Sequence, residues 1–323
     1  MAQQVRWLDE QRFIVGRWDG SISLFEVSIA SKEPPRLITA MTTPSGEGVQ
    51  MLVTADANTF VSSARQDSLL IWRKDFGGQF LPELVSYPGH HGVAVSGRFV
   101  EYEDQRYLIT GHEQGDLLIW SVDGDTQLSL LRVVDLRMPV AIDYLHDEQP
   151  LRHIRGLAVW KDGIIVAGGE DGGLHQVQLV DGAILSQRLF NPKARLGVND
   201  LAVHGDNLLV VNCAVGQQDR NVWLYRLSHN QIQNRDSANL LLDPNIGRIF
   251  AFDIATYEQQ GDSFALVTTK EGLIWRLRFA DGQLYPLGNL PLGRFHYGNA
   301  IDYNERSRSV AAAGISVRLV AID

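Results

Sequence analysis

One phrase recurs along this chain and constrains its fold more than any other feature. It is a β-rich run, a glycine or another small residue, a polar turn, and a second short run that ends in an aromatic or apolar residue. The seven copies span residues 12–25, 60–72, 107–120, 164–177, 208–225, 264–277 and 310–320. They recur about every 49 residues. Because an array of repeats folds as one unit, a length of 323 residues does not by itself require two domains.

Each copy has the pattern of a β-hairpin, with Val, Ile, Leu and Phe on both sides of a polar turn. Most copies follow another apolar run and precede a further extended stretch, which supply two more strands. A repeat of roughly 40 to 50 residues with four strands is typical of a propeller blade. The sequence therefore predicts an all-β, seven-bladed β-propeller with four-stranded antiparallel blades, formed by a single domain over residues 1–323. The expected blades span 1–44, 45–88, 89–151, 152–194, 195–247, 248–293 and 294–323.

The hairpins resemble those of the WD-repeat (tryptophan-aspartate repeat) family. Residues 19–25, 66–72 and 114–120 are similar to that family's Asp-Gly-x-apolar-x-apolar-Trp hairpin, and Gly89 with His90 is similar to its Gly-His dipeptide. The family builds a buried hydrogen-bonded set from a His, a Ser or Thr, an Asp and a Trp in each blade. Here the third blade has His90, Thr110 and Trp120 but Gln114 in place of the Asp. The resemblance therefore implies a propeller with degenerate repeats, held together mainly by apolar packing, with His90 in a structural role.

The C-terminal blade raises the question of how the ring closes. Only residues 1–4 precede the first inner strand, and the last recognisable strand, 316–321, stops two residues before the C-terminus. One alternative is a three-stranded last blade whose edge pairs with a partner chain or a neighbouring segment. Missing sequence or an obligate partner would then explain why the chain stops after the third strand of that blade. The other is that residues 1–7 close the ring unaided in a distorted register. The residues of the strand-addition edge are Ser316, Val317, Arg318, Leu319 and Val320.

Three inner strands carry an aspartate at what the sequence suggests is one shared offset, namely Asp200, Asp253 and Asp302. Because inner strands line the channel of a propeller, we expect these channel acids to face one another at one height. Clustered carboxylates raise one another's pKa, bind a cation, or accept hydrogen bonds from backbone amides. We expect structural hydrogen bonding, and a cation or basic-peptide site is the alternative.

The loops around the channel mouth form a second candidate surface, with a basic and histidine-bearing rim. Binding sites concentrate on loops held by a rigid scaffold, and Arg and Trp are enriched at contact hot spots. The predicted partner-binding residues are Arg17, Trp18, Arg65, His112, Glu113, Arg152, Arg155, Arg195, Arg248, Lys270, Arg294 and His296. A solvated ring of loops without a ligand is the alternative.

Motifs that carry chemistry are missing from the sequence. It has no Gly-rich phosphate loop followed by Lys, no Gly-x-Ser-x-Gly elbow and no His-Glu-x-x-His pair, and Cys213 lies in an apolar run that predicts an inert thiol. We therefore expect no catalytic residues, no metal and no cofactor. A formal charge of −9 argues against direct binding to nucleic acid or to an anionic membrane. The absence of long apolar runs and of a basic, apolar leader predicts a cytoplasmic protein without a membrane span.

These observations predict a non-catalytic protein–protein interaction scaffold, a subunit of a hetero-complex with other proteins. It would present the loop face around the channel and the open blade edge to its partners. The alternative is a propeller hydrolase, or a module that binds a small anionic ligand or a metal at the channel mouth.

Overall fold

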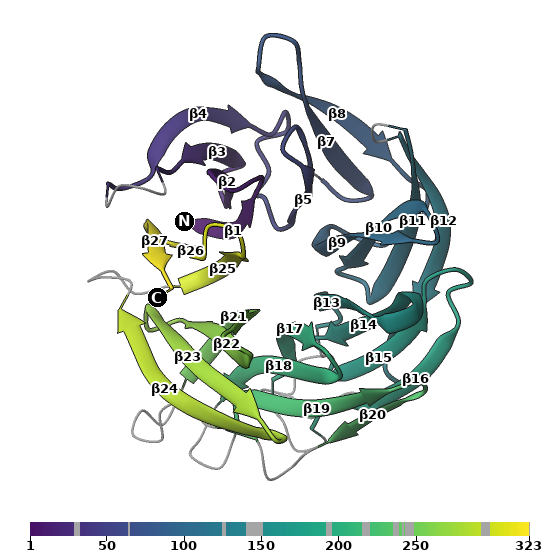
Figure 1. Ribbon diagram of the computed structural model, residues 1–323. Helices are drawn as coiled ribbons and strands as arrows, with labels where there is room; N and C mark the ends of the chain where they lie inside the picture. Colours follow the sequence, from purple (N-terminus) through teal and green to yellow (C-terminus); the bar gives the residue numbers. More distant parts are fainter. Residues whose placement is uncertain are drawn as a thin grey trace.

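The antiparallel sheets of this chain follow one another around a ring, with the first strand of each sheet nearest the centre (Figure 1). The computed structural model describes residues 1–28, 33–63, 65–124, 127–139, 151–191, 196–214, 220–234, 239–240, 242, 249–291 and 298–322. Apart from one 3-10 turn, η1 (Lys161–Gly163), all regular elements in these ranges are strands. The architecture is the all-β propeller that the repeat predicts.

The first half of the ring consists of four sheets of four strands each. The first has β1 (Ala2–Trp7), β2 (Arg12–Arg17), β3 (Ser21–Glu26) and β4 (Arg36–Thr42), and the second has β5 (Leu52–Asp56), β6 (Thr59–Ser63), β7 (Ser68–Lys74) and β8 (Phe80–Ser86). The third has β9 (Ala94–Tyr102), β10 (Gln105–His112), β11 (Asp116–Asp123) and β12 (Gln127–Asp135). The fourth has β13 (Ile154–Trp160), β14 (Ile164–Gly169), β15 (Gly173–Gln178) and β16 (Ile184–Leu189).

The second half of the ring has one eight-stranded and one three-stranded sheet. The eight strands are β17 (Val198–His204), β18 (Asn207–Ala214), β19 (Val222–Ser228), β20 (Gln231–Asn234), β21 (Ile249–Gln259), β22 (Asp262–Thr269), β23 (Leu273–Ala280) and β24 (Gln283–Pro291). The last sheet has β25 (Gly298–Asn304), β26 (Ser309–Gly314) and β27 (Val317–Ala321).

The expected count of seven separate blades is wrong. Within the described ranges the strands group into five sheets of four or more strands and one sheet of three. The eight-stranded sheet arises because the end of β18 also pairs with β21, through Cys213 opposite Phe250 and Ala214 opposite Ile249. Hydrogen bonds thus cross a junction where the repeat predicted a break between two blades.

The ring closes between β1 and β25 through side-chain contacts rather than through a shared strand. β1 pairs with β2 in its own sheet. The Trp7 backbone N–H donates to Asp302 Oδ2 at 2.8 Å, and the Trp7 indole N–H donates to the Asp302 carbonyl at 3.1 Å. Asn299 Nδ2 donates to the Ala2 carbonyl at 2.8 Å. The last sheet is three-stranded, which was one of the two sequence alternatives, and in the described part of the chain β27 pairs only with β26.

The hydrophobic core is a series of clusters that lie between neighbouring sheets. Ile14 of the first sheet, for example, packs in one cluster with Phe60 and Trp72 of the second. Phe60 and Trp72 are stacked with ring centroids 5.5 Å apart. Burying each such side chain contributes about 1.5–3 kcal/mol, so apolar packing between sheets supplies most of the cohesion, as the degenerate repeats imply.

Two glycines show how the local sequence produces these sheets. Gly20 ends the β2–β3 turn at a φ of 77°, a conformation that glycine adopts without strain, and its N–H donates to the Arg17 carbonyl. Gly156 of β13 lies against β17, where a Cβ atom would be 3.0 Å from the Leu201 backbone nitrogen. The inner strands of these two sheets therefore approach each other more closely than a side chain at 156 would allow.

In the described part of the chain, no helix is long and apolar enough to cross a membrane.

We predict that Gly156→Ala lowers the free energy of unfolding by about 1–3 kcal/mol, because the added methyl group overpacks the junction between β13 and β17. The measurement is urea unfolding followed by tryptophan fluorescence. Gly77→Ala is the matched control, because Gly77 is exposed and its nearest neighbour is the flexible side chain of Asp75, 3.3 Å from the added atom. Equal effects of the two substitutions would contradict this account of inter-sheet packing.

Candidate functional site

The inner strands that line the channel share an irregularity that the sequence does not display. In six of them the ladder to the next strand skips one residue near the start, which is a β-bulge. The skipped residues are Gln3, Val95, Arg155, Asn199, Phe252 and Asn299. A bulge shifts the register by one residue and therefore decides which later side chains share a height along the channel.

The bulge corrects the expected alignment of the channel acids. Asp200 and Asp253 directly follow the bulged residues of β17 and β21, whereas Asp302 lies three positions after the bulged residue of β25. The three carboxylates are therefore not at one height. Asp200 and Asp253 are the close pair, because both accept the Ile254 N–H, Asp200 through Oδ2 at 3.1 Å and Asp253 through Oδ1 at 2.9 Å.

Each channel acid holds its own inner strand to the next one around the ring. Asp200 Oδ2 accepts the Ile254 N–H at 3.1 Å, which links β17 to β21. Asp253 Oδ2 accepts the Ile301 N–H at 2.9 Å, which links β21 to β25. Asp302 makes the same kind of bond to Trp7, which links β25 to β1. Three successive junctions, including the one that closes the ring, thus depend on a carboxyl group and a backbone amide.

Burial raises the pKa of two of these acids. The pKa of Asp200 lies well above its ordinary value because of burial and, next, because of the neighbouring Asp253 charge. Burial also raises the pKa of Asp302, and the Arg6 guanidinium partly opposes that rise. These contacts agree with the structural interpretation of the channel acids. Within the described residues, no group of three or more His, Cys, Asp or Glu side chains is placed to hold a metal ion.

Sequence reasoning missed two residues of the channel, Arg6 and Arg98. Both line two cavities, of about 370 and 390 Å³, that meet in the channel. Arg6 lies three positions after the bulge of β1 and Arg98 three positions after the bulge of β9, so they occupy the height of Asp302. The sequence feature that could have identified them is a charged residue inside an inner strand, where apolar residues are usual.

The structure distributes the predicted partner-binding residues over several environments. Trp18 is 52% exposed, and Arg65 and Arg152 are also exposed. Arg17 and Lys270 are half-buried: Arg17 donates to the Ser23 hydroxyl at 2.6 Å, and the Lys270 ammonium lies 5.0 Å from the centre of the Phe250 ring.

Two further members of that set, Glu113 and Arg155, already have partners within the chain. Glu113 accepts the Val93 N–H at 3.0 Å. Arg155 donates to Glu170 at 2.6 Å, and that carboxylate also pairs with His153. Arg195, Arg248, Arg294 and His296 lie outside the described residues.

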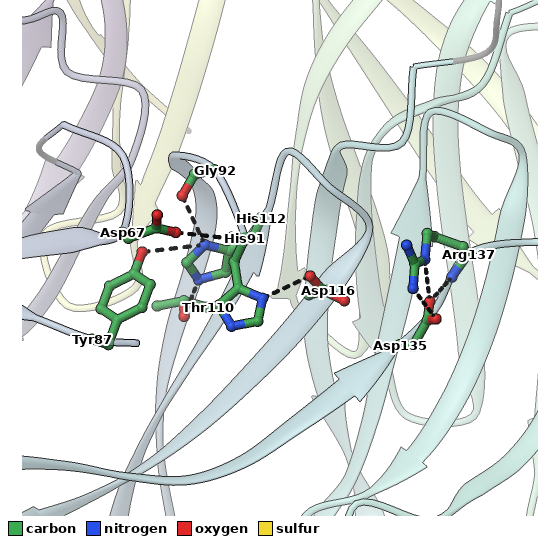
Figure 2. Close-up of polar contacts among 9 residues, drawn as sticks. All are labelled: Asp67, Tyr87, His91, Gly92, Thr110, His112, Asp116, Asp135 and Arg137. Atoms are coloured by element: carbon green, nitrogen blue, oxygen red, sulfur yellow. Dashed lines mark hydrogen bonds and ion pairs between the residues drawn. The ribbon is translucent and has the colours of Figure 1, made fainter. Parts of the chain in front are cut away.

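His112 is not a surface residue, which corrects its assignment as a partner contact. Its side chain is fully buried, and its ring contacts Thr110 Oγ1 through Nε2 at 2.8 Å and Tyr87 through Nδ1 at 3.3 Å (Figure 2). The Trp120 indole N–H donates to the same Thr110 oxygen at 3.0 Å. Burial lowers the pKa of His112 to about 4, so the ring is neutral at pH 7.

The structural histidine of this blade is His91 rather than His90. His90 is exposed, whereas the His91 ring lies 2.7 Å from Asp116 Oδ2 and its backbone N–H donates to Asp67 Oδ1 at 2.9 Å (Figure 2). The set that joins Thr110 to Trp120 resembles the one the WD-repeat family implies, but its histidine is His112, and His91 forms separate contacts with Asp67 and Asp116.

Cys213 lies at the junction between β18 and β21, where Asn199 Nδ2 donates to its sulfur at 3.2 Å. Burial raises the pKa of this thiol to about 12, so it stays protonated and unreactive at pH 7.

Comparison with known proteins establishes the fold. No protein-family model and no curated protein sequence matches the chain. The chain is similar to the crystal structure of the β-propeller domain of Cps50 (Swd1) from Myceliophteria thermophila, with 12% identity, a TM-score of 0.69, and coverage of 100% of this chain and 97% of that one. It is also similar to the computationally designed Ika8 protein, with 16% identity, a TM-score of 0.61, and coverage of 99% and 83%. At these identities the likeness shows a β-propeller and no more.

We predict that Asp302→Ala lowers the free energy of unfolding by about 1–3 kcal/mol, because the buried Trp7 amide loses its acceptor where the ring closes. Asp302→Asn keeps an acceptor oxygen and removes the charge, so we expect it to stay within about 1 kcal/mol of the parent. Urea unfolding at pH 7 measures both. An alanine variant as stable as the parent would show that the closing contact is dispensable.

We predict that His112 and His175 lower stability as the pH drops from about 6.5 towards 4, because both are buried with a pKa of about 4 and the unfolded chain takes up their protons first; the raised pKa values of Asp200 and Asp302 act in the opposite direction. Among the described residues neither ring nitrogen of His175 has a hydrogen-bond partner, so His175→Leu removes this linkage without removing a bond. We expect His175→Leu to reduce the loss of unfolding free energy between about pH 6.5 and 4 by up to about 3 kcal/mol.

The measurement for this pH dependence is the urea unfolding free energy at several pH values. His90→Leu, at an exposed position, is the control for removing a histidine side chain. If His175→Leu shows the same pH dependence as the parent, proton uptake by His175 does not limit stability in acid.

Proposed function

We propose that this chain is a non-catalytic protein–protein interaction subunit of a cytoplasmic hetero-complex, built as one degenerate WD-repeat propeller over residues 1–323. The likeness to a natural propeller domain along its full length supports a rigid scaffold. The observation that carries the interaction role is the edge of the last sheet, strand β27, which is an exposed third strand. In this proposal the partners of the chain are other proteins, and the chain itself makes no direct contact with nucleic acid.

β27 differs from the third strands of the other sheets in its exposure. The third strands β7 and β11 are covered by the fourth strands β8 and β12, and their first five residues are all buried. In β27 no residue is buried, and Arg318 and Ala321 are exposed. Val317, Leu319 and Val320 are half-buried, so an added strand would cover apolar side chains as well as backbone.

The hydrogen bonds around β27 identify which of its amides point outward. The Ile322 N–H donates to the Arg308 carbonyl, and the Gly314 N–H donates to the Ser316 carbonyl. Because bonded and non-bonded pairs alternate in an antiparallel ladder, Arg318 and Val320 bond to β26. The amides of Val317, Leu319 and Ala321 therefore point away from β26, where a fourth strand would lie.

An extended segment of a partner protein is the occupant that fits this edge. Main-chain hydrogen bonds from an added strand give affinity, and pockets for alternate side chains give specificity. The loop face is a second contact surface in this proposal. There Trp18 and Arg65 line a cavity of about 340 Å³ between the first and second sheets. Arg17, Glu113, Arg152, Arg155 and Lys270, together with Arg195, Arg248, Arg294 and His296, complete the proposed loop contacts.

We predict that Ala321→Pro abolishes partner binding, because proline removes an outward amide that β26 does not use. Ala321→Thr is the matched control, because threonine keeps the amide and favours strand structure. The measurement is affinity purification of the tagged chain from its native host in mild salt. The expected result is a stoichiometric protein retained by the parent and the threonine variant and lost from the proline variant.

Hydrogen exchange on the isolated chain supplies the independent check. The amides of Val317, Leu319 and Ala321 should exchange much faster than those of Arg318 and Val320. Equal protection of both sets would mean that the edge is already covered and would overturn strand addition. A partner retained equally by both Ala321 variants would move the contact to the loop face.

A further inference from the structure

Two arginines inside the channel form no ion pair with the described residues. Arg6 of β1 and Arg98 of β9 line both channel cavities, together with Asp253. The only protein acceptor of the Arg6 guanidinium in the described structure is the Val5 carbonyl at 2.7 Å, and its buried Nε has no hydrogen-bond partner. Arg98 donates, within the described ranges, only to the Gly97 carbonyl at 3.2 Å. Each guanidinium has five donors, so most of them remain available.

The channel acids do not neutralise these arginines by direct contact. Among the described residues, neither Arg6 nor Arg98 forms an ion pair with Asp200, Asp253 or Asp302. The carboxyl oxygens instead accept the backbone amides that join neighbouring strands. Burial and the neighbouring Asp253 charge also raise the pKa of Asp200 well above its ordinary value, which favours the neutral form of that carboxyl group.

Arg6 and Arg98 line the same two cavities, so their like charges act on each other. Burial lowers the pKa of Arg98 and the neighbouring Arg6 charge lowers it further, whereas the charges of Asp200, Asp253 and Asp302 raise it. Like charges in a confined, partly dehydrated channel are costly unless an ion of opposite charge lies between them. An anion between the two guanidinium groups would reduce their repulsion.

The channel has room for such an anion at the height of the arginines. Three positions after the bulge, where β1 and β9 carry Arg6 and Arg98, the strands β13, β17 and β21 carry Ala158, Ala202 and Ala255, and β25 carries Asp302. All three alanines line the cavity of about 390 Å³. Small side chains opposite two long cationic ones leave space beside the guanidinium groups.

We propose that the channel binds a small organic molecule through an oxyanion group, a carboxylate or a phosphate, held between Arg6 and Arg98. Guanidinium forks match the geometry of both groups and bind them in bidentate fashion. The cavity of about 370 Å³ on the loop-face side exceeds the size of a single oxyanion and holds the body of the ligand beside Phe252 and Asn199. This site goes beyond the proposed interaction role and does not depend on the β27 edge.

Isothermal titration calorimetry with inorganic phosphate, glucose 6-phosphate and citrate, at matched ionic strength in chloride, tests the proposal. We expect saturable binding of at least one probe at one site per chain. Arg6→Met and Arg98→Met should each raise the dissociation constant at least about tenfold, because each removes one guanidinium fork. Arg226→Met, which changes an exposed arginine of β19, should leave it within about twofold.

Two further readouts keep the test decisive. Circular dichroism confirms the fold of each variant, and Arg98→Lys, which keeps the charge but loses the fork, should bind about three- to tenfold more weakly than the parent. Preference for citrate identifies a carboxylate ligand, and preference for a phosphate probe identifies a phosphate. Absence of saturable binding of all three probes below about 10 mM would overturn the proposal. So would binding that both methionine variants leave unchanged.

Discussion

The contact between neighbouring sheets is the constraint on which the rest of this molecule depends. A single propeller sheet buries its faces only against the sheets beside it, and the apolar clusters of the described residues lie at such junctions. The packing of Ile14 against Phe60 and Trp72 shows how one junction is filled by residues of two sheets. Along the channel, backbone amides donate hydrogen bonds to side-chain acceptors of the preceding inner strand. The absence of a side chain at Gly156 allows the inner strands β13 and β17 to lie close together. Because each junction is local, the ring tolerates the loss of the repeated hydrogen-bonding set from most blades.

Closure of the ring follows the same rule. The junction between β25 and β1 joins residues 295 positions apart in the chain, yet it uses the kind of bond found between β17 and β21, a carboxyl group that accepts an amide. Since β1 pairs with β2 and closes the ring through side chains, the last sheet keeps a free outer edge at β27 among the described strands. Structural closure and an available edge are therefore compatible, and the proposed partner strand is not needed to hold the ring together.

The channel combines two kinds of charge with different uses. The aspartates face backbone amides, so their position is explained by the junctions they hold. Arg6 and Arg98 hold no junction in the described structure: their only protein acceptors are carbonyls of their own preceding residues. A buried charge without a structural role is expensive, and such groups concentrate at functional sites. This contrast separates the arginines, which sequence reasoning overlooked, from the acids that it singled out.

Alternation of apolar and polar residues, with a polar turn in each copy, determined the strands and hairpins, because a strand's two faces alternate with every residue. The repeated four-strand unit determined the propeller. Because the copies keep their apolar residues but lack most of the family's His, Ser or Thr, Asp and Trp set, the sequence also indicated that apolar packing would hold the blades together. Only the tertiary structure decided which residues meet. The extra pairing of β18 with β21 joined two groups of strands that the repeat separates. A single bulged residue, such as Asn299, placed Asp302 at the height of Arg6 rather than at that of Asp200, and His91 instead of His90 contacts Asp67 and Asp116. A one-residue shift leaves the composition and period of a strand unchanged but moves each side chain to another height or face, so these positions depend on contacts between segments far apart in the chain.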